Sequence, residues 1–211
     1  MLKPDDRSHL FELLKPPVGF RLESAVGTTF SLDLISLLTL PCSFALFDWE
    51  QEDGKPAADP LALLEALRRY GDRMTIFCQV GQIRIPEGKY QPILTYLESS
   101  ICQVIPRQKN GIFHPKVWVL KFTSDEEATQ YRVLCLSRNL TFDRCWDSAV
   151  VLDGELKERQ NFIRKNNPLA DFVEELASLS KSVSSDRRKQ IRDMAQDLRK
   201  VAFDLPEGFH D

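Results

Sequence analysis

The chain has 211 residues, of which 43% are hydrophobic and 28% are charged, and its formal net charge is −3. This length suffices for one α/β domain with a buried core, and the composition excludes wholesale disorder, collagen-like repeats and low-complexity sequence. The longest apolar stretch, residues 32–47, is interrupted by Asp33 and several hydroxyl residues, so it does not provide the span of about 20 apolar residues that a membrane helix needs. The N-terminus has no apolar signal core and the five cysteines form no CxxC pair, which predicts a cytoplasmic protein without a disulfide framework.

Charge is distributed unevenly along the chain. Residues 68–144 hold twelve Lys and Arg against seven Asp and Glu, whereas residues 1–67 hold five against eleven. A basic segment of this size attracts phosphates through counterion release, and it is equally compatible with an ordinary solvated face. The charge pattern therefore leaves nucleic acid open as a partner without selecting it.

Six short segments rich in β-branched and aromatic residues, bounded by Gly, Pro, Asn or Asp, are typical of strands. They cover residues 20–26, 74–80, 101–105, 113–122, 131–137 and 149–152. Helical patterns occupy residues 32–40, 60–71 and 92–99, while residues 42–49 fit either a helix or a buried strand. Strands alternating with helices predict an α/β fold, in which a mixed β-sheet carries helices on both faces.

The character of the chain changes after about residue 154. Two helical patterns follow, one from Asn167 and Pro168 and one from Asp186, each with apolar residues on one face. We expect residues 1–154 to form the main domain and residues 155–211 a helical segment that packs on the sheet or connects to a missing region. The chain ends on LPEGFHD without a polar taper, which favours a longer natural protein. The polar stretch 51–58 is expected to be an exposed loop.

Polar side chains interrupt two otherwise apolar strand patterns. His114 and Lys116 precede VWVL, and Ser137 and Asn139 follow YRVLCL. Because alternate residues of a strand face the same side, each pair is expected on one face, and pairing of the two strands would bring all four side chains together. An imidazole, an ammonium, a hydroxyl and a carboxamide each need a buried partner in a core. A bound phosphate would satisfy all four.

The order His-x-Lys, apolar strand, Ser-x-Asn-Leu-Thr resembles the half-motif of the phospholipase D superfamily, HxK followed by GSxN. Asp147 falls where that family commonly keeps an acidic residue that orients the histidine. Two positions depart from the pattern: Lys121 stands near the place of the motif Asp, and Leu136 replaces the glycine. Loss of the Asp is familiar in the branch that resembles tyrosyl-DNA phosphodiesterases and metal-independent restriction nucleases.

The resemblance implies a phospholipase D-like catalytic domain in residues 1–154 and a metal-independent phosphodiesterase that uses no cofactor. His114 would attack phosphorus to form a phosphohistidine, and a second histidine would protonate the leaving oxygen. Lys116 and Asn139 would hold the non-bridging oxygens, with Ser137 and Asp147 completing the catalytic set. No cluster of Asp, Glu and His at metal-ligand spacing stands beside the motif.

One chain supplies half of such a site. His9, His114 and His210 are its three histidines, and only His114 lies in an HxK pattern. Either two copies pair about a twofold axis so that each contributes His114, or a longer chain carries a second half-motif. For the chain as given we expect a homodimer.

Nucleic acid, DNA or RNA, is the expected substrate, because the middle third is basic and no membrane-binding segment is evident. The candidates for contacts to backbone phosphates are Arg138, Arg107 and Lys109. By resemblance, the expected setting is bacterial restriction or antiphage defence, with a helicase or another defence-system component as partner. No membrane partner is expected.

Simpler interpretations stand beside this one. The domain could be catalytically degenerate and bind nucleic acid or a partner protein, with Lys121 and Leu136 as signs of decay. Cys135 and Cys145 lack further ligands for a metal site, and Ser137 lacks the Gly-x-Ser-x-Gly elbow of a serine hydrolase. The indoles of Trp118 and Trp146 are expected to pack in the core or at its edge.

Overall fold

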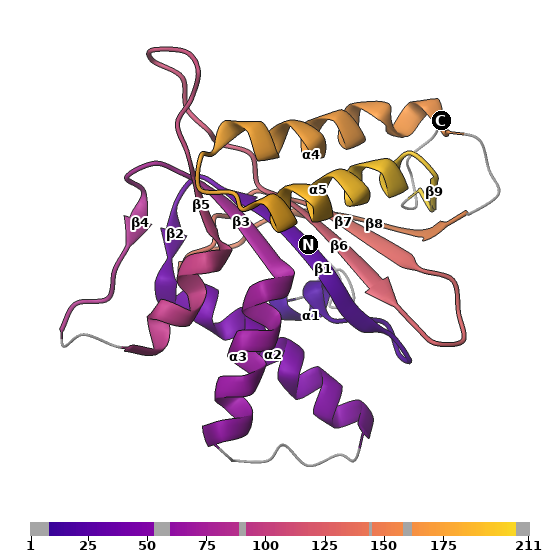
Figure 1. Ribbon diagram of the computed structural model, residues 1–211, viewed down its shortest axis with the longest axis horizontal. Coiled ribbons are helices and arrows are strands. Elements are labelled where there is room, and N and C mark those ends of the chain that lie inside the picture. Colours follow the sequence, from indigo (N-terminus) through magenta and orange to yellow (C-terminus); the bar gives the residue numbers. More distant parts are fainter. Residues whose placement is uncertain (1–8, 53–59, 89–91, 144, 158–161, 206–211) are drawn as a thin grey trace.

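The protein is a three-layered α/β structure, here described by a computed structural model (Figure 1). Helices α2 (Leu34–Glu52) and α3 (Pro60–Arg73) lie against one face of a seven-stranded mixed sheet, and helices α4 (Asn167–Leu179) and α5 (Ser185–Leu198) lie against the other. This arrangement confirms the predicted fold class. The structure describes residues 9–52, 60–88, 92–143, 145–157 and 162–205.

The sheet has the strand order β5-β3-β1-β6-β7-β8-β9. Its strands are β1 (Arg21–Thr29), β3 (Met74–Gln79), β5 (Ile101–Val104), β6 (Val117–Thr123), β7 (Gln130–Leu136), β8 (Ala149–Leu156) and β9 (Val201–Phe203). The first three are parallel to one another, and β6 pairs antiparallel with β1 and begins the antiparallel half. The carboxyl ends of β1 and β7 therefore lie beside the amino end of β6.

One hydrophobic core fills the space between the sheet and α2, α3, the short helix α1 (Leu10–Leu14) and the 3-10 helix η2 (Pro92–Ser100). Trp118 lies in this core and is 3% exposed, as expected from the sequence. Gly27 makes room for that indole, since a Cβ at this position would come within 3.0 Å of Trp118 and Ile76. Any larger residue at position 27 would therefore displace Trp118, which follows the HxK segment, or Ile76.

Helix α2 begins directly after Asp33, whose Oδ1 accepts hydrogen bonds from the backbone N–H groups of Ile35 (2.9 Å) and Ser36 (3.1 Å). Such capping satisfies amides that the helix itself leaves unpaired. The helix continues through Pro41. Among the described residues, no helix is both long and apolar enough to cross a membrane.

A second core lies between the opposite face of the sheet and the C-terminal helices. Val26, Phe77 and Val133 project from the sheet into it, and Ile191 and Leu198 project from α5. A 3-10 turn, η3 (Arg164–Asn166), precedes α4, and a separate two-stranded sheet joins β2 (Leu32–Asp33) to β4 (Ile83–Arg84). The helices of the C-terminal segment thus pack on the face of the sheet opposite α2 and α3.

The structure refines several sequence-based boundaries. The strand expected at 113–122 begins only at Val117, since Pro115 has no N–H to contribute to a ladder. Residues 42–49 belong to α2 rather than to a buried strand, and the helix expected at 92–99 is a 3-10 helix.

The predicted boundary at residue 154 falls inside β8. In the expected loop 51–58, residues 51 and 52 end α2 and the rest lie outside the described residues. That residues 155–211 connect to a further region stays a prediction.

Arg187 fastens α5 to the start of β3 and to the end of α3. Its side chain is buried, and its guanidinium donates to the carbonyl oxygens of Met74 and Gly71 (3.0 Å for Gly71) and to the hydroxyls of Thr75 (2.9 Å) and Ser99 (3.4 Å). All four acceptors are neutral, and burial lowers the pKa of the guanidinium. Neutral hydrogen-bond acceptors therefore surround the buried cation, and the nearby Asp72 carboxylate partly offsets the effect of burial on its pKa.

Replacing Arg187 by methionine should lower the free energy of unfolding by about 2–4 kcal/mol, because two buried carbonyl groups lose their donor. Chemical denaturation of both proteins measures this difference. The exposed Lys189 on the same helix is the matched control, and Lys189→Ala should change the stability by less than about 0.5 kcal/mol. Equal stabilities of Arg187→Met and the unsubstituted protein would contradict the anchoring role.

Candidate active site

The carboxyl end of β1 holds the HxK segment in place. The buried hydroxyl of Thr28 accepts a hydrogen bond from the backbone N–H of Val117 (2.8 Å) and donates one to the carbonyl of the same residue (3.1 Å). On the far side of Lys116, the backbone N–H of Phe113 donates to Gln79 Oε1 (2.7 Å) at the end of β3. His114 and Lys116 therefore lie on a short extended segment that is pinned at both ends.

Asn139 is fixed to the same strand end. Its Oδ1 accepts a hydrogen bond from the backbone N–H of Phe30 (3.3 Å), and the next residue, Leu140, donates its N–H to the hydroxyl of Thr29 (3.0 Å). Because the amide oxygen is occupied by an N–H donor, the NH₂ group of Asn139 remains as its hydrogen-bond donor. The side chain is oriented to donate, as an anion-binding group must.

Phe30 brings the two motif segments together. Its backbone binds Asn139, and its ring lies 5.0 Å from the imidazole of His114, measured between centroids, with the planes tilted by 42°. Lys116 Nζ lies 3.0 Å from Nδ1 and 3.3 Å from Nε2 of the same imidazole. An ammonium only donates, so a hydrogen bond between the two side chains runs from Lys116 to whichever ring nitrogen carries a lone pair.

Ser137 and Asp147 form a separate pair. The Ser137 hydroxyl donates to Asp147 Oδ1 (2.8 Å) and accepts from the backbone N–H of Ser148 (2.9 Å). The hydrogen bond from Leu136 N–H to the Lys116 carbonyl (2.8 Å) sets those two residues opposite each other, so Ser137 starts on the other face. The structure thus joins His114, Lys116 and Asn139 through Phe30, and it does not show the expected convergence of Ser137 with them.

Asp147 also makes no described contact with His114. Its carboxylate accepts from Cys145 Sγ (3.2 Å) and lies 3.9 Å from an Arg138 nitrogen, besides its bond to Ser137. The hydrogen bond to Asp147 raises the pKa of the Cys145 thiol. In this structure the described contacts of Asp147 are therefore to Ser137, Arg138 and Cys145, and not to the histidine.

Arg138 is bound within the same loop. Its Nη2 donates to the carbonyls of Thr141 (2.9 Å) and Asp143 (3.4 Å). Both bonds use Nη2, and the buried Nε has no hydrogen-bond partner among the described residues. Trp146, expected in the core or at its edge, is instead 79% exposed on this loop. Trp146 is flanked by polar residues of a loop, so no periodic apolar pattern in the sequence indicated whether it is buried or exposed.

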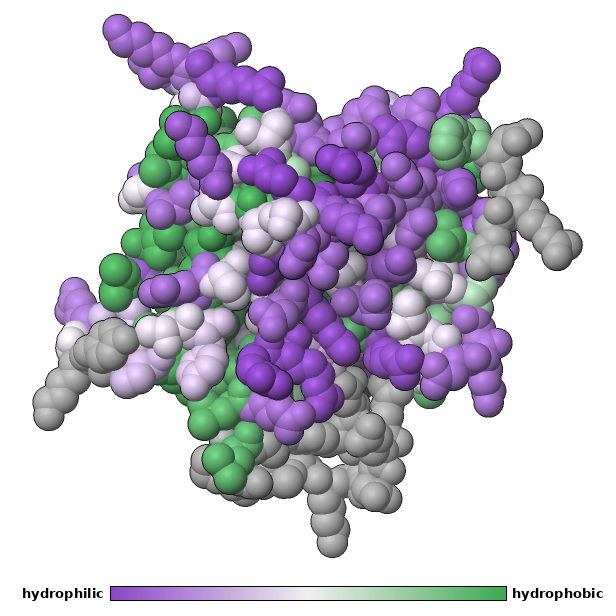
Figure 2. Space-filling model, viewed as in Figure 1, coloured by the Kyte–Doolittle hydropathy of each residue, from purple (hydrophilic) through white to green (hydrophobic). Residues whose placement is uncertain are grey.

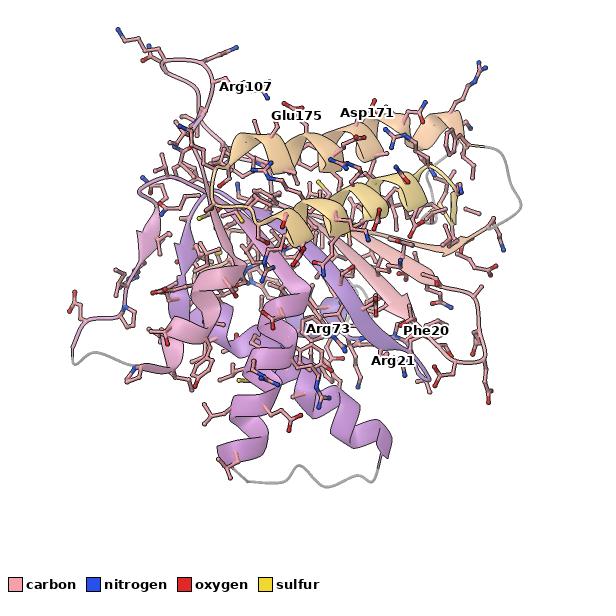
Figure 3. All side chains as sticks on the ribbon, in the orientation of Figure 1. Phe20, Arg21, Arg73, Arg107, Asp171 and Glu175 are labelled. Atoms are coloured by element: carbon pink, nitrogen blue, oxygen red, sulfur yellow. The ribbon has the colours of Figure 1, made fainter. Side chains whose placement is uncertain are left out.

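The other two candidate phosphate ligands differ from each other. Arg107 forms an ion pair with Glu175 (2.5 Å) and donates to the Ser178 hydroxyl (2.9 Å), which ties the loop after β5 to α4 (Figure 3). Lys109 is exposed near the tip of that loop and has no partner among the described residues. Of the two, Lys109 is the side chain whose charge is available to a ligand.

The two departures from the family pattern have structural explanations. Lys121 forms an ion pair with Asp197 of α5 (3.0 Å), and the buried Tyr131 donates to the same carboxylate oxygen (2.6 Å). Burial and the neighbouring Asp197 raise the pKa of Tyr131. Leu136 packs against the first core beside Lys116. Lys121 therefore joins α5 to the sheet through an ion pair, and Leu136 contributes to the hydrophobic core.

Sequence reasoning missed the residues that position the site: Thr28, Thr29, Phe30 and Gln79. These residues lie at strand ends that carry no recognisable motif. The one signal in the sequence was the pair of threonines, Thr28 and Thr29, at the end of the apolar strand β1. Of the other histidines, His9 precedes α1 and His210 lies outside the described residues. Within those residues, no three His, Cys, Asp or Glu side chains gather as metal ligands.

Comparison with known proteins supports the fold. No family model and no curated protein matches the sequence. A crystal structure of yeast tyrosyl-DNA phosphodiesterase matches with a TM-score of 0.52 and 10% identity, over 91% of this chain and 40% of that one. A histidine-to-asparagine mutant of the yeast enzyme matches with a TM-score of 0.52 and 11% identity, over 92% and 37%. This chain thus spans about two fifths of the length of those structures, and its fold resembles that part of yeast tyrosyl-DNA phosphodiesterase.

Proposed function

We propose that this protein is a metal-independent phosphodiesterase, a nuclease acting on DNA or RNA through a phosphohistidine. The observation that carries the proposal is the joining of His114, Lys116 and Asn139 at the carboxyl end of β1, where Phe30 contacts two of the three. A nucleophile, a cation and an amide donor are the groups that phosphoryl transfer requires. The fold shared with tyrosyl-DNA phosphodiesterase supports this assignment.

The first chemical step forms a covalent bond between a ring nitrogen of His114 and phosphorus. The bond from phosphorus to the leaving oxygen breaks, and a second histidine in its protonated form gives that oxygen its proton. In the second step the same histidine, now neutral, takes a proton from water. The resulting oxygen nucleophile attacks phosphorus, and the bond to His114 breaks. Atoms and protons balance over the two steps without a cofactor.

Lys116 and Asn139 supply the electrostatic part of the mechanism. In the free protein the ammonium lies against the imidazole, so a bound phosphate has to draw it from the ring nitrogen to a non-bridging oxygen. This exchange frees the lone pair that attacks phosphorus. The Asn139 NH₂ group, held by the bond of its oxygen to Phe30, donates to another non-bridging oxygen.

The second histidine comes from another copy of this half-site. The exposure of His114 leaves it accessible to a second protomer, and a twofold axis would place two His114 rings around one phosphate. A homodimer is the arrangement we propose for this chain, and a second half-motif in a longer chain would serve equally. The biological setting we propose, by family resemblance, is bacterial restriction or antiphage defence.

Hydrolysis of a small phosphodiester and of a single-stranded oligonucleotide should persist in excess EDTA, because none of the proposed steps uses a metal. The measurement compares initial rates with EDTA, with EDTA and excess magnesium, and with no addition. Equal rates in the three conditions are expected. Loss of hydrolysis in EDTA with recovery in magnesium would contradict the mechanism.

A further inference from the structure

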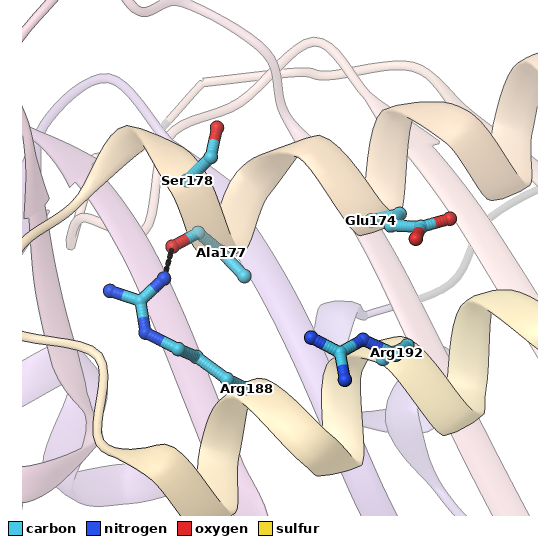
Figure 4. A pocket seen from close by; sticks show the side chains of 5 residues that line it. All are labelled: Glu174, Ala177, Ser178, Arg188 and Arg192. Atoms are coloured by element: carbon cyan, nitrogen blue, oxygen red, sulfur yellow. Dashed lines mark hydrogen bonds between the residues drawn. The ribbon is translucent and has the colours of Figure 1, made fainter.

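A pocket of about 230 Å³ lies between α4 and α5, on the side of the sheet opposite α2 and α3. It is lined by Glu174, Ala177, Ser178, Arg188 and Arg192 (Figure 4). Pockets that enclose a whole small-molecule ligand usually measure about 300–1,000 Å³. This one suits a single group of a longer molecule.

The pocket carries an uncompensated positive charge. The guanidinium of Arg192 points into the space between the helices (Figure 4), and among the described residues it has no hydrogen bond or ion pair. The Glu174 carboxylate is already paired with Arg199 (3.2 Å). Arg188 donates to the carbonyls of Ala177 and Ser180 at the end of α4, so it shapes the wall while Arg192 remains available to an anion.

The surface around the pocket is polar and carries charges of both signs, and the carboxylates of Asp171, Glu174 and Glu175 on α4 are already paired with Arg199 and Arg107. In the space-filling view, hydrophilic residues cover most of α4 and α5 (Figure 2). Lys181 and Lys189 are exposed between the helices and on α5, and neither has a partner within the described structure. An anionic ligand larger than the pocket would therefore meet further cations at its rim.

The pocket is joined to the candidate active site through one loop. Arg107, on the loop between β5 and β6, binds Glu175 and Ser178 of α4, and Ser178 lines the pocket. The same loop leads to His114, seven residues further along. Lys109 lies on this loop between Arg107 and His114.

We infer that the pocket between α4 and α5 binds a backbone phosphate of a polynucleotide whose reacting phosphate lies at His114, with Arg192 as its main ligand. This inference rests on the proposed function, and it predicts an extended polynucleotide as substrate. The pocket contributes affinity for that substrate and has no part in the chemistry.

Two assays of Arg192→Ala separate binding from chemistry. The KM for a single-stranded oligonucleotide of about 20 nucleotides should rise several-fold with kcat unchanged, while hydrolysis of a small phosphodiester stays the same. Binding of the fluorescent oligonucleotide to a His114→Ala background should show a salt slope smaller by about 0.7–0.9 when Arg192 is also replaced. The control is Arg68→Ala, which removes one exposed arginine from α3 on the other face.

The outcomes distinguish this inference from the proposed function. An Arg192→Ala variant that matches Arg68→Ala in KM and in salt slope overturns the pocket assignment, even if hydrolysis is normal. A protein without hydrolysis that still binds the oligonucleotide through Arg192 supports the pocket and refutes the proposed chemistry. Polyglutamate that competes as strongly as the oligonucleotide, with the same dependence on Arg192, would assign the pocket to an acidic protein partner instead.

Discussion

His114→Ala should reduce hydrolysis of every phosphodiester substrate to the uncatalysed background. The imidazole is the nucleophile in the proposed mechanism, and no neighbouring group in the described structure takes its place: Ser137 is bonded to Asp147. Loss of a nucleophile in other enzymes costs about 10⁴- to 10⁶-fold in kcat. Initial rates with a small diester measure the effect without interference from oligonucleotide binding.

His9→Ala is the matched control, since it removes a histidine that precedes α1 and lies outside the motif. It should retain full activity. If two protomers share one site, adding an excess of His114→Ala protein to the unsubstituted enzyme, with time for exchange, should also lower the rate. Mixed dimers have one histidine where the reaction needs two. Full activity of the His114→Ala variant by itself would place the site elsewhere.

Lys116→Ala and Asn139→Ala should each lower kcat by about 10²- to 10³-fold, because each removes a donor that stabilises charge in the transition state. The contacts of both residues support this role: Lys116 Nζ lies at the imidazole, and the Asn139 oxygen is fixed to Phe30. Asp147→Asn should have a smaller effect, since Asp147 binds Ser137 and Cys145 and has no described contact with His114.

The comparison of kcat with KM tests the assignment of these residues. A loss in kcat at unchanged thermal stability supports a catalytic role for Lys116 and Asn139. If Asp147→Asn were as damaging as Lys116→Ala, then Asp147 would act on the histidine in the catalytic state, as the family resemblance implies. A rise in KM alone for Asn139→Ala would reduce that residue to substrate binding.

Local sequence patterns predicted the architecture because each main strand is short, apolar and bounded by turn residues. Helix α3 was predictable from Pro60 at its first position, which suits a helix start. β9 was missed because three residues, Val201–Phe203, carry too little pattern. The residues of η2, which packs against α3 and β5, show a helical pattern that does not distinguish a 3-10 helix from an α-helix.

The candidate site was predictable as far as it resides in one motif. The HxK and SxN segments were found from residue spacing, and the antiparallel pairing of β6 and β7 sets the two segments next to each other, although Ser137 turns away from His114 and Lys116. The side of the sheet on which Ser137 lies was not predictable. It depends on the strand register, which sets Leu136 opposite Lys116. The role of Lys121 depends on Asp197, 76 residues away in the sequence, and single-sequence patterns contain no such information.

The most direct test of the central claim is identification of the covalent intermediate. A radiolabelled phosphodiester, mixed with the enzyme for less than one turnover and quenched in alkaline denaturant to preserve phosphohistidine, should leave the label on the protein. Peptide mapping should locate it at His114, and the His114→Ala protein should carry none. Turnover without label on the protein, or label on another residue such as Ser137, would contradict the assignment of His114 as the nucleophile.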